Sequence, residues 1–311
     1  NAWHLKRLDA VVAMAEARDI KLLLMFADAP CWASSAPESL KQGCSGKWWE
    51  RGVQRYLPTR PADYGDALAY LARRYGTRVA AWEMWNEPNH ETFNPGPDKA
   101  RRYAALVRAA YPKAKAAAPG VKFLAGALST ADFKFTEELF ANGMGSSFDA
   151  FSVHPYANDK SPLDPGSDDW VNTSFVRGIP AVRRALVRRG IYKPIWLTEF
   201  GWSTTRVRDA APYRNGVDAD VQARYIGQAL AQARKWSYVP VAIYYNLRDR
   251  AVDSTSRTDH FGLTRVDGTP KPALAAFRAA ATGASASRKA RRARAARRRA
   301  RAARAAHRTV R

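Results

Sequence analysis

The chain has 311 residues, of which 46% are hydrophobic and 11% aromatic, and its 51 Lys and Arg outnumber its 28 Asp and Glu to give a formal net charge of +23. This length suits one large β/α barrel or two smaller domains and leaves ample room for a buried core. No run of eighteen apolar residues occurs, so no transmembrane helix is predicted.

Helix and strand patterns alternate along the chain. Apolar side chains one helical turn apart predict that the chain opens on a helix over residues 3–18. Strands are predicted near 21–27, 79–86, 121–127, 148–153, 194–199 and 240–245, and further helices near 62–75, 98–117, 132–143, 174–189, 217–235 and 272–281. The strands are apolar almost throughout and each is followed by a helix, which indicates a parallel sheet covered by helices.

The connections that follow the predicted strands are long, whereas several of those that follow helices are only a few residues. In parallel β/α folds, the loops at the carboxyl ends of the strands build the functional site. Several aromatic side chains fall in or beside these loops, among them Trp32 and Trp202. Flat rings suit flat, partly apolar ligands such as sugars. We therefore predict that Trp32 and Trp202 contact substrate, with core packing as the alternative for each.

The two cysteines of the chain, Cys31 and Cys44, lie in the first of these loops. No His or Cys nearby has the spacing of zinc ligands. We predict that the two form a disulfide. Free thiols in a reducing compartment are the alternative, and the spacing leaves both open.

Two of the predicted strands run directly into a glutamate. The second strand leads into Glu87, where Pro88 ends the hydrogen-bonding ladder, and the fifth leads into Glu199, where Gly201 lets the chain turn away. Parallel strands end at the same edge, so the two carboxyl groups are expected to face each other. Two carboxyl groups flanking a bond are the minimum apparatus for glycoside hydrolysis. The alternative is that each glutamate pairs with one of the many Lys and Arg residues.

Two further polar residues lie close to these strand ends. Glu83 shares the strand parity of Glu87 but comes four residues earlier, about 13 Å deeper at the rise of a strand, and is predicted to be structural. Asn246 follows the last strand and is predicted to line the sugar site, with packing as the alternative. No metal or cofactor is implied, because neither ligand spacing nor a phosphate-binding glycine loop is present.

Three motifs resemble those of the clan A glycoside hydrolases, and the chain is most similar to family 39 and to the cellulase-like family 5 enzymes. The segment Trp85-Asn86-Glu87-Pro88-Asn89 resembles the acid/base motif that ends barrel strand four. The segment Trp196-Leu197-Thr198-Glu199-Phe200-Gly201-Trp202 resembles the nucleophile motif that ends strand seven. His154-Pro155-Tyr156 resembles the strand-six pattern. The resemblance covers roughly residues 3–281.

The resemblance implies a role for each matching residue. Glu87 is expected to be the general acid/base and Glu199 the nucleophile of a retaining mechanism, with carboxyl groups about 5 to 5.5 Å apart. Asn86 is expected to contact the 2-hydroxyl of the sugar. His154 and Tyr156 are expected to shape the subsite and to orient the nucleophile.

The same resemblance implies a (β/α)8 TIM barrel, but the strands do not complete it. If the strand near 79–86 is strand four, the strand near 21–27 is strand three and the opening helix is helix two. Strand 1, helix 1 and strand 2 are then missing from this chain. A barrel short of two strands has unpaired edges and an open core, so we interpret residues 1–283 as a partial barrel domain within a longer protein.

Residues 284–311 form a separate basic segment. They hold twelve Lys and Arg, eleven Ala and no acid, which leaves 39 basic against 28 acidic residues, a net +11, for residues 1–283. This segment lacks an apolar stripe and is predicted to be disordered in isolation. Anionic polymers such as acidic polysaccharide, cell wall or nucleic acid are its expected partners, and a solubilising extension without a partner is the alternative.

Together these observations predict a secreted retaining glycoside hydrolase that acts on a β-linked oligo- or polysaccharide without a cofactor. One rival is a carbohydrate-binding barrel without catalysis, but that class needs neither Glu87 nor Glu199. A second is a nucleic-acid-binding protein, but half of the positive charge lies in 284–311 and no nucleic-acid motif occurs in the barrel.

Overall fold

The computed structural model describes residues 2–208, 211 and 213–283, so the basic segment 284–311 and its predicted disorder lie outside the described residues. The chain divides into two compact units. The first comprises Asn1–Phe200 and Trp236–Tyr244, and the second comprises Gly201–Lys235 and Tyr245–Arg311. The prediction that 1–283 form one barrel domain stays a prediction.

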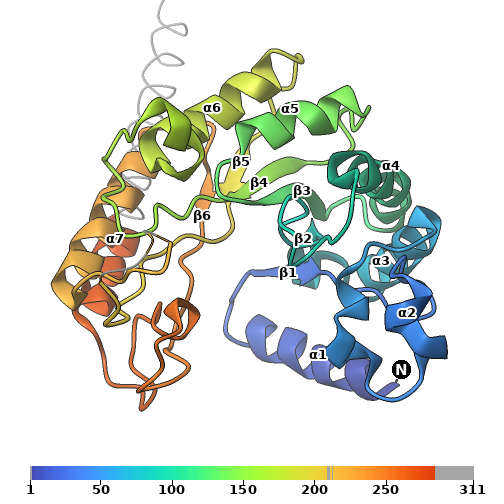
Figure 1. Cartoon of the computed structure of the whole chain (residues 1–311), viewed down its shortest axis with the longest axis horizontal. Helices are drawn as coiled ribbons and strands as arrows, with labels where there is room; N and C mark the ends of the chain where they lie inside the picture. Colours follow the sequence, from blue (N-terminus) through green and yellow to red (C-terminus); the bar gives the residue numbers. More distant parts are fainter. Residues whose placement is uncertain (1, 209–210, 212, 284–311) are drawn as a thin grey trace, which may run out of the picture. The chain divides into compact units, whose positions relative to one another are not determined.

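The first unit is built on a six-stranded parallel sheet in which each described strand pairs with the next one along the chain, in the order β1-β2-β3-β4-β5-β6 (Figure 1). This order confirms the predicted α/β fold, and it is the order of strands three to eight of a barrel. The strands are β1 (Leu22–Phe26), β2 (Val79–Met84), β3 (Lys122–Ser129), β4 (Ala150–His154), β5 (Ile195–Leu197) and β6 (Val241–Ala242).

The middle of the sheet is buried on both faces, as expected for a parallel sheet covered by helices. Every residue of β4 is buried, and only the first and last residues of β3 are not. The two end strands are less protected: β1 is largely half-buried, with Met25 44% exposed, and both residues of β6 are half-buried. Within the described residues, the central strands of the sheet are therefore buried and its two edge strands are more exposed.

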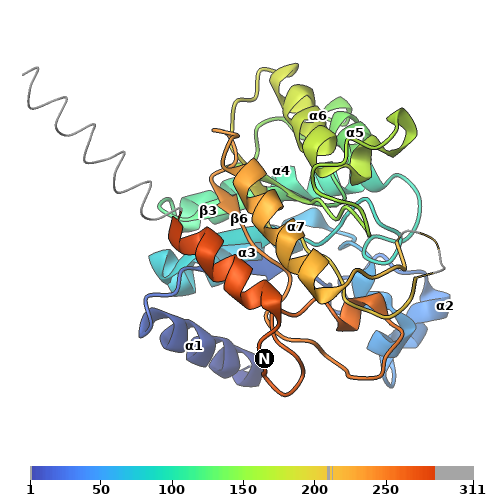
Figure 2. The ribbon, with the colours of Figure 1, turned by 90° about the vertical axis from the view of Figure 1, so that its left-hand side faces the viewer.

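Helices of the first unit lie between the strands in sequence. They are α1 (Ala2–Glu16), α2 (Glu38–Lys41), α3 (Pro61–Tyr75), α4 (Lys99–Ala117), α5 (Phe133–Ala141) and α6 (Phe175–Val187), with short 3-10 turns at Gln42–Cys44, Trp48–Arg51, Val53–Arg55, Gly76–Arg78 and Asp168–Thr173. Pro61 is the first residue of α3, where its missing N–H costs no helical hydrogen bond. Helices α5 and α6 pack together, as both ribbon views show (Figures 1 and 2).

The second unit contains α7 (Ala219–Ala233), the short turn Arg257–Asp259 and a further helical stretch at 272–283. Its core includes Trp202, which packs edge-on against Tyr225 at 5.5 Å between ring centroids. The buried Gln222 side chain donates to the carbonyl of Trp202 at 2.8 Å. Among the described residues, no helix combines the length and apolarity needed to span a bilayer.

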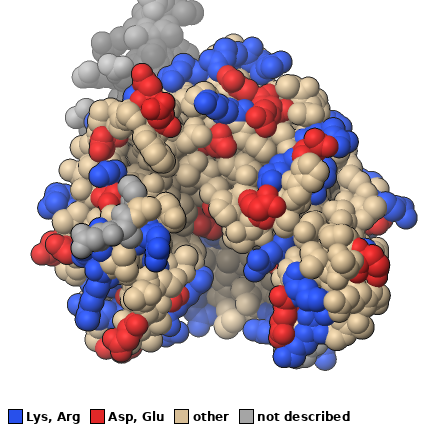
Figure 3. All heavy atoms as spheres, viewed as in Figure 1, with Lys and Arg blue, Asp and Glu red and all other residues tan. Residues whose placement is uncertain are grey.

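Charged side chains of both signs share the surface. In the face drawn in Figure 3, Lys and Arg lie among Asp and Glu rather than in one basic patch. Several form ion pairs, such as Arg74 with Asp9 at 2.7 Å and Lys113 with Asp66 at 2.6 Å. This mixed distribution differs from the basic stripe typical of a nucleic-acid-binding surface.

Candidate active site

Glu87 lies at the carboxyl end of β2, as the sequence predicts. Strand β2 ends at Met84, and the N–H of Trp85 still donates to the carbonyl of Phe26 in the neighbouring strand at 3.0 Å. The backbone then leaves the extended conformation, with φ of 73° at Trp85 and 40° at Glu87. The N–H of Glu87 donates to the carbonyl of Ala127 at 2.9 Å, which fixes the start of its side chain.

A glycine in β3 makes this backbone contact possible. The register between β3 and β4 shifts between Ala125 and Leu128, and Gly126 in this irregularity has φ of 115°. A Cβ at Gly126 would lie 2.3 Å from the backbone oxygen of Ser152, so only glycine fits. The bulge turns the Ala127 carbonyl toward the N–H of Glu87, in keeping with the way bulges re-aim groups beside active sites.

The last residue of the acid/base motif ties its loop to the next strand. The Asn89 side chain accepts from the N–H of Ser129 at 2.9 Å and donates to the carbonyl of Ser129 at 3.0 Å and to Asp132 at 3.1 Å. Asp132 is also the N-cap of α5, where it accepts from the N–H of Phe135 at 3.0 Å, and it accepts a further bond from Asn172. One carboxylate thus anchors the catalytic loop, a helix start and the loop after β4.

The two predicted catalytic carboxylates meet around one imidazole. The Nδ1 of His154, the last residue of β4, lies 3.1 Å from an oxygen of Glu87 and 3.8 Å from an oxygen of Glu199. The hydroxyl of Tyr156 donates to the same oxygen of Glu199 at 2.7 Å. Because both oxygens lie that close to one nitrogen, they are at most about 7 Å apart, which is compatible with the retaining geometry and reaches only the lower edge of the inverting range.

The His154 ring is buried, with 1% of its side chain exposed. Burial alone lowers the pKa of His154, but the hydrogen bond to Glu87 and the negative charges of Glu199 and Glu83 outweigh it and raise the pKa from 6.5 to about 9. The imidazole is therefore a cation at neutral pH. Its ring lies between the two acidic side chains of the site.

Glu83 belongs to this cluster more closely than the sequence indicated. It is buried, and burial raises its pKa, while the charge of His154 and the hydroxyls of Ser152 and Thr198 partly counteract that effect. Glu83 therefore interacts electrostatically with both His154 and Glu199.

One further member of the acid/base motif has a free oxygen at the site. The Oδ1 of Asn86 is buried and has no hydrogen-bond partner among the described residues. An unsatisfied buried acceptor is costly and calls for an explanation, such as a ligand that donates to it. This arrangement fits the predicted contact with a sugar hydroxyl.

Contacts with Glu87, Glu199 or His154 are not seen for the remaining predicted site residues within the described part of the chain. Trp202 and Asn246 belong to the second unit; Trp202 is fully buried, which favours its packing role, and Asn246 has a buried Oδ1 without a partner among the described residues. Trp32 lies in the first unit with 72% of its surface exposed. Cys31 and Cys44 form a disulfide with a Cα–Cα distance of 5.7 Å, as predicted.

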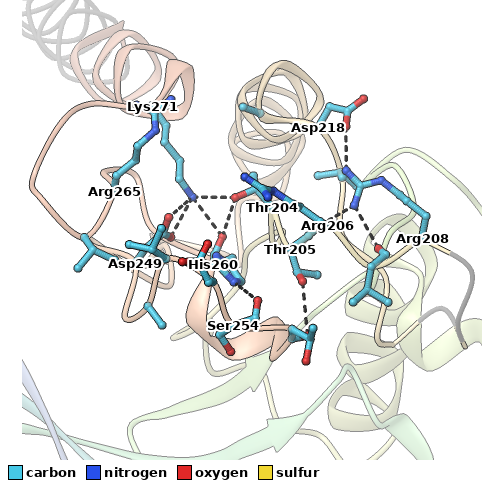
Figure 4. A pocket seen from close by; sticks show the side chains of 18 of the residues that line it. Thr204, Thr205, Arg206, Arg208, Asp218, Asp249, Ser254, His260, Arg265 and Lys271 are labelled. Carbon is cyan, nitrogen blue, oxygen red and sulfur yellow. Dashed lines mark hydrogen bonds and ion pairs between the residues drawn. The ribbon is translucent and has the colours of Figure 1, made fainter.

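A cavity of about 820 Å³ lies in the second unit, and its lining begins at Thr204, two residues after Trp202. Its floor is a buried ion pair in which the Lys271 ammonium lies 2.7 Å from Asp249 and donates to the Thr204 hydroxyl at 2.8 Å (Figure 4). Burial lowers the pKa of Lys271, and Asp249 counteracts that effect.

Within the described parts of the chain, no group of three or more His, Cys, Asp or Glu side chains is arranged to hold a metal ion.

Comparison with known proteins gives a family match and a fold match. The model of the glycosyl hydrolases family 39 matches residues 37–284, about four-fifths of the chain. No curated protein sequence matches. The fold is similar to that of a family 39 glycoside hydrolase from the gut symbiont Bacteroides cellulosilyticus WH2, at 22% identity and a TM-score of 0.68 over 89% of this chain and 52% of that chain.

Two other solved structures give the same result. A monomeric beta-xylosidase from Caulobacter crescentus CB15 has 19% identity and a TM-score of 0.60 over 88% of this chain and 55% of its own. An enzyme from Xanthomonas axonopodis pv. citri has 20% identity and a TM-score of 0.62, over 88% and 54%. The chain spans about half the length of these structures. At such identities the similarity shows the fold, so the six-stranded sheet is part of a TIM barrel.

Proposed function

The chain belongs to glycosyl hydrolases family 39, and from this premise we propose that it is a retaining hydrolase of β-linked glycosides, with Glu87 as general acid/base and Glu199 as nucleophile. The observation that carries the proposal is the placement of both carboxylates around the Nδ1 of His154, at 3.1 and 3.8 Å. The upper limit of about 7 Å that these distances set favours direct attack by one carboxylate over activation of a water held between the two.

The reaction proceeds in two steps. Glu199 attacks the anomeric carbon while Glu87 protonates the leaving oxygen, and water activated by Glu87 then releases the sugar from the glycosyl ester. The Tyr156 hydroxyl, 2.7 Å from Glu199, orients the attacking carboxylate. The His154 ring, 3.1 Å from Glu87 and 3.8 Å from Glu199, holds the two side chains in position. The free Oδ1 of Asn86 is placed to accept a hydrogen bond from a sugar hydroxyl.

Hydrolysis by single variants tests this assignment. Release of the phenol from an aryl β-xyloside is measured for the chain and for its Glu199→Gln and Glu87→Gln variants. Each variant is expected to lose roughly a thousandfold in kcat/KM. The exposed Glu138 on α5 provides a matched control, because Glu138→Gln makes the same chemical change away from the site. A xyloside probe is chosen because one structural relative is described as a beta-xylosidase.

The stereochemistry of the product tests the retaining step. Proton NMR of the first-formed sugar is expected to show the β-anomer before mutarotation. An α-anomer would replace the retaining mechanism with an inverting one. If no aryl glycoside or β-linked glycan is hydrolysed while glycans still bind, the carbohydrate-binding barrel becomes the better reading of the site.

We also propose that the protein works outside the cytosol. The Cys31–Cys44 disulfide supports this location, because disulfides persist in oxidising compartments and are rare in reducing ones. Thiol labelling of protein from culture medium and from cell extract of the source organism tests it. Disulfide-linked protein is expected in the medium, and labelled thiols confined to the extract would contradict the proposal.

A further inference from the structure

The loop between β1 and α3, residues 27–60, exposes two tryptophans. Trp32 is 72% exposed and Trp49 is 50% exposed. Indole rings are highly buried on average, because each removes a large apolar area from water when it packs. Two rings left in solvent on one loop are therefore unusual features that a ligand with apolar faces would explain.

This loop is held rigid by its own contacts. The disulfide joins Cys31 to Cys44, and both pack in a small cluster with Val53 and Trp48. Each exposed tryptophan is the immediate neighbour of a cluster member, Trp32 of Cys31 and Trp49 of Trp48. The cluster therefore fixes the backbone from which both indoles project.

Polar contacts brace the same segment. The Arg51 guanidinium donates to the carbonyls of Leu40 at 2.6 Å and Ser45 at 2.9 Å. The buried Ser34 hydroxyl donates to the carbonyl of Val53 at 2.5 Å. A rigid aromatic surface binds with a smaller loss of conformational freedom than a flexible one. Rigidity and exposure together are what a binding platform requires.

The loop emerges beside the catalytic motif. It leaves β1, which pairs in parallel with β2, at the same edge of the sheet as Glu87. The carbonyl of Phe26, the last residue of β1, accepts from the N–H of Trp85, two residues before Glu87. Neighbouring strands lie about 4.8 Å apart, so the loop begins next to the strand end that carries Glu87.

We propose that Trp32 and Trp49 form a sugar-stacking platform for distal units of a polysaccharide chain, so that the substrate of the proposed hydrolase is an extended β-linked polymer rather than a short glycoside. This proposal rests on the proposed function for the place of cleavage. The hydrophobic face of a pyranose ring stacks on indole, and a chain that repeats such faces engages two rings at once.

Binding to neutral polymers tests the platform independently of catalysis. The full 311-residue chain with Glu87→Gln and Glu199→Gln serves as the parent, so that substrate is not consumed. Its migration is measured in native gels containing unsubstituted β-1,4-xylan or mixed-linkage β-glucan. Neutral polymers are used because the basic segment 284–311 binds acidic ones by charge alone. Trp32→Ala and Trp49→Ala are then added singly and together.

Tyr192→Ala is the matched control. Tyr192 is 71% exposed, nearly the same as Trp32, but it precedes β5 and so lies at the opposite edge of the sheet. We expect the parent and the Tyr192→Ala variant to be retarded equally by at least one polymer, and the double tryptophan variant to bind it roughly tenfold more weakly. Unchanged unfolding midpoints in urea will show that the exposed substitutions leave the fold intact.

Retardation of the double tryptophan variant equal to that of the parent would overturn the proposal, and so would the absence of retardation of the parent by either polymer. In the catalytically intact chain, the same two substitutions are expected to lower kcat/KM on polymer by a larger factor than kcat/KM on the aryl β-xyloside. If polymer binding depends on the tryptophans but no substrate is cleaved, the platform stands and the proposed hydrolase fails.

Discussion

Raising the pH through the titration of His154 should remove a defined part of the stability of the protein. The ring is fully buried between acidic side chains, and its pKa is raised from 6.5 to about 9. Each pKa unit corresponds to about 1.4 kcal/mol, so the shift represents roughly 3 kcal/mol. Because the folded-state pKa exceeds the unfolded one, this contribution is fully present below pH 6.5 and is lost as the pH rises through 9.

The assay is urea unfolding of the chain and of His154→Gln at steps between pH 6 and pH 10. The free-energy difference between the two proteins is expected to shrink by roughly 3 kcal/mol over this range, because the variant has no imidazole to deprotonate. His90→Gln, at an exposed position of the loop after β2, is the control and should show no such trend. A difference that stays constant from pH 6 to pH 10, or an NMR titration of His154 near 6.5, would refute the reasoning.

Three other variants test further features of the first unit. Glu83→Gln removes one of the negative charges that raise the pKa of His154, so NMR should find the imidazole titrating at lower pH, and an unchanged pKa would contradict the cluster. Gly126→Ala places a Cβ 2.3 Å from a backbone oxygen of β4, which should cost about 3 kcal/mol in urea unfolding and reduce hydrolysis; a cost below 1 kcal/mol would mean that the bulge relaxes easily. Cys31→Ser with Cys44→Ser should lower the free energy of unfolding by about 2–4 kcal/mol, and the parent in dithiothreitol should match it.

The sequence predicts well that Glu87 and Glu199 follow strand ends, because both strand ends are strongly marked. Pro88 directly follows Glu87, and Gly201 follows Glu199 after one residue, so periodicity and breakers together place both carboxylates at one edge of a parallel sheet. Their meeting around His154 depends on registers between β2, β4 and β5 that no local pattern specifies. The order of the strands was predictable, but the distances between their ends were not.

Some features of the site could not be predicted from the sequence, and each has a physical reason. The electrostatic coupling of Glu83 to His154 was not predicted, because it depends on the relative positions of β2 and β4, which no local pattern specifies. The bulge at Gly126 was missed because a single glycine in an apolar strand also fits a regular strand, although an isolated strand glycine is a known indicator of bulges. Asn89 lies in the motif that contains Glu87, but the sequence does not indicate its role. Its hydrogen bond to Asp132 shows that it anchors this loop.

The sharing of Asp132 between a helix cap and the catalytic loop has a consequence for how this protein tolerates change in evolution. In general, the loss of an N-cap side chain lowers the free energy of unfolding by about 1 kcal/mol. A stabilising substitution at a distant surface position readily offsets such a loss. Here the same carboxylate receives Asn89 and Asn172 as well as the first turn of α5. A substitution at Asp132 is therefore expected to change folding and the proposed hydrolysis together, and a remote substitution that restores only stability is not expected to restore that hydrolysis. In a mutational scan, Asp132 should behave like a catalytic position although it touches neither carboxylate of the pair.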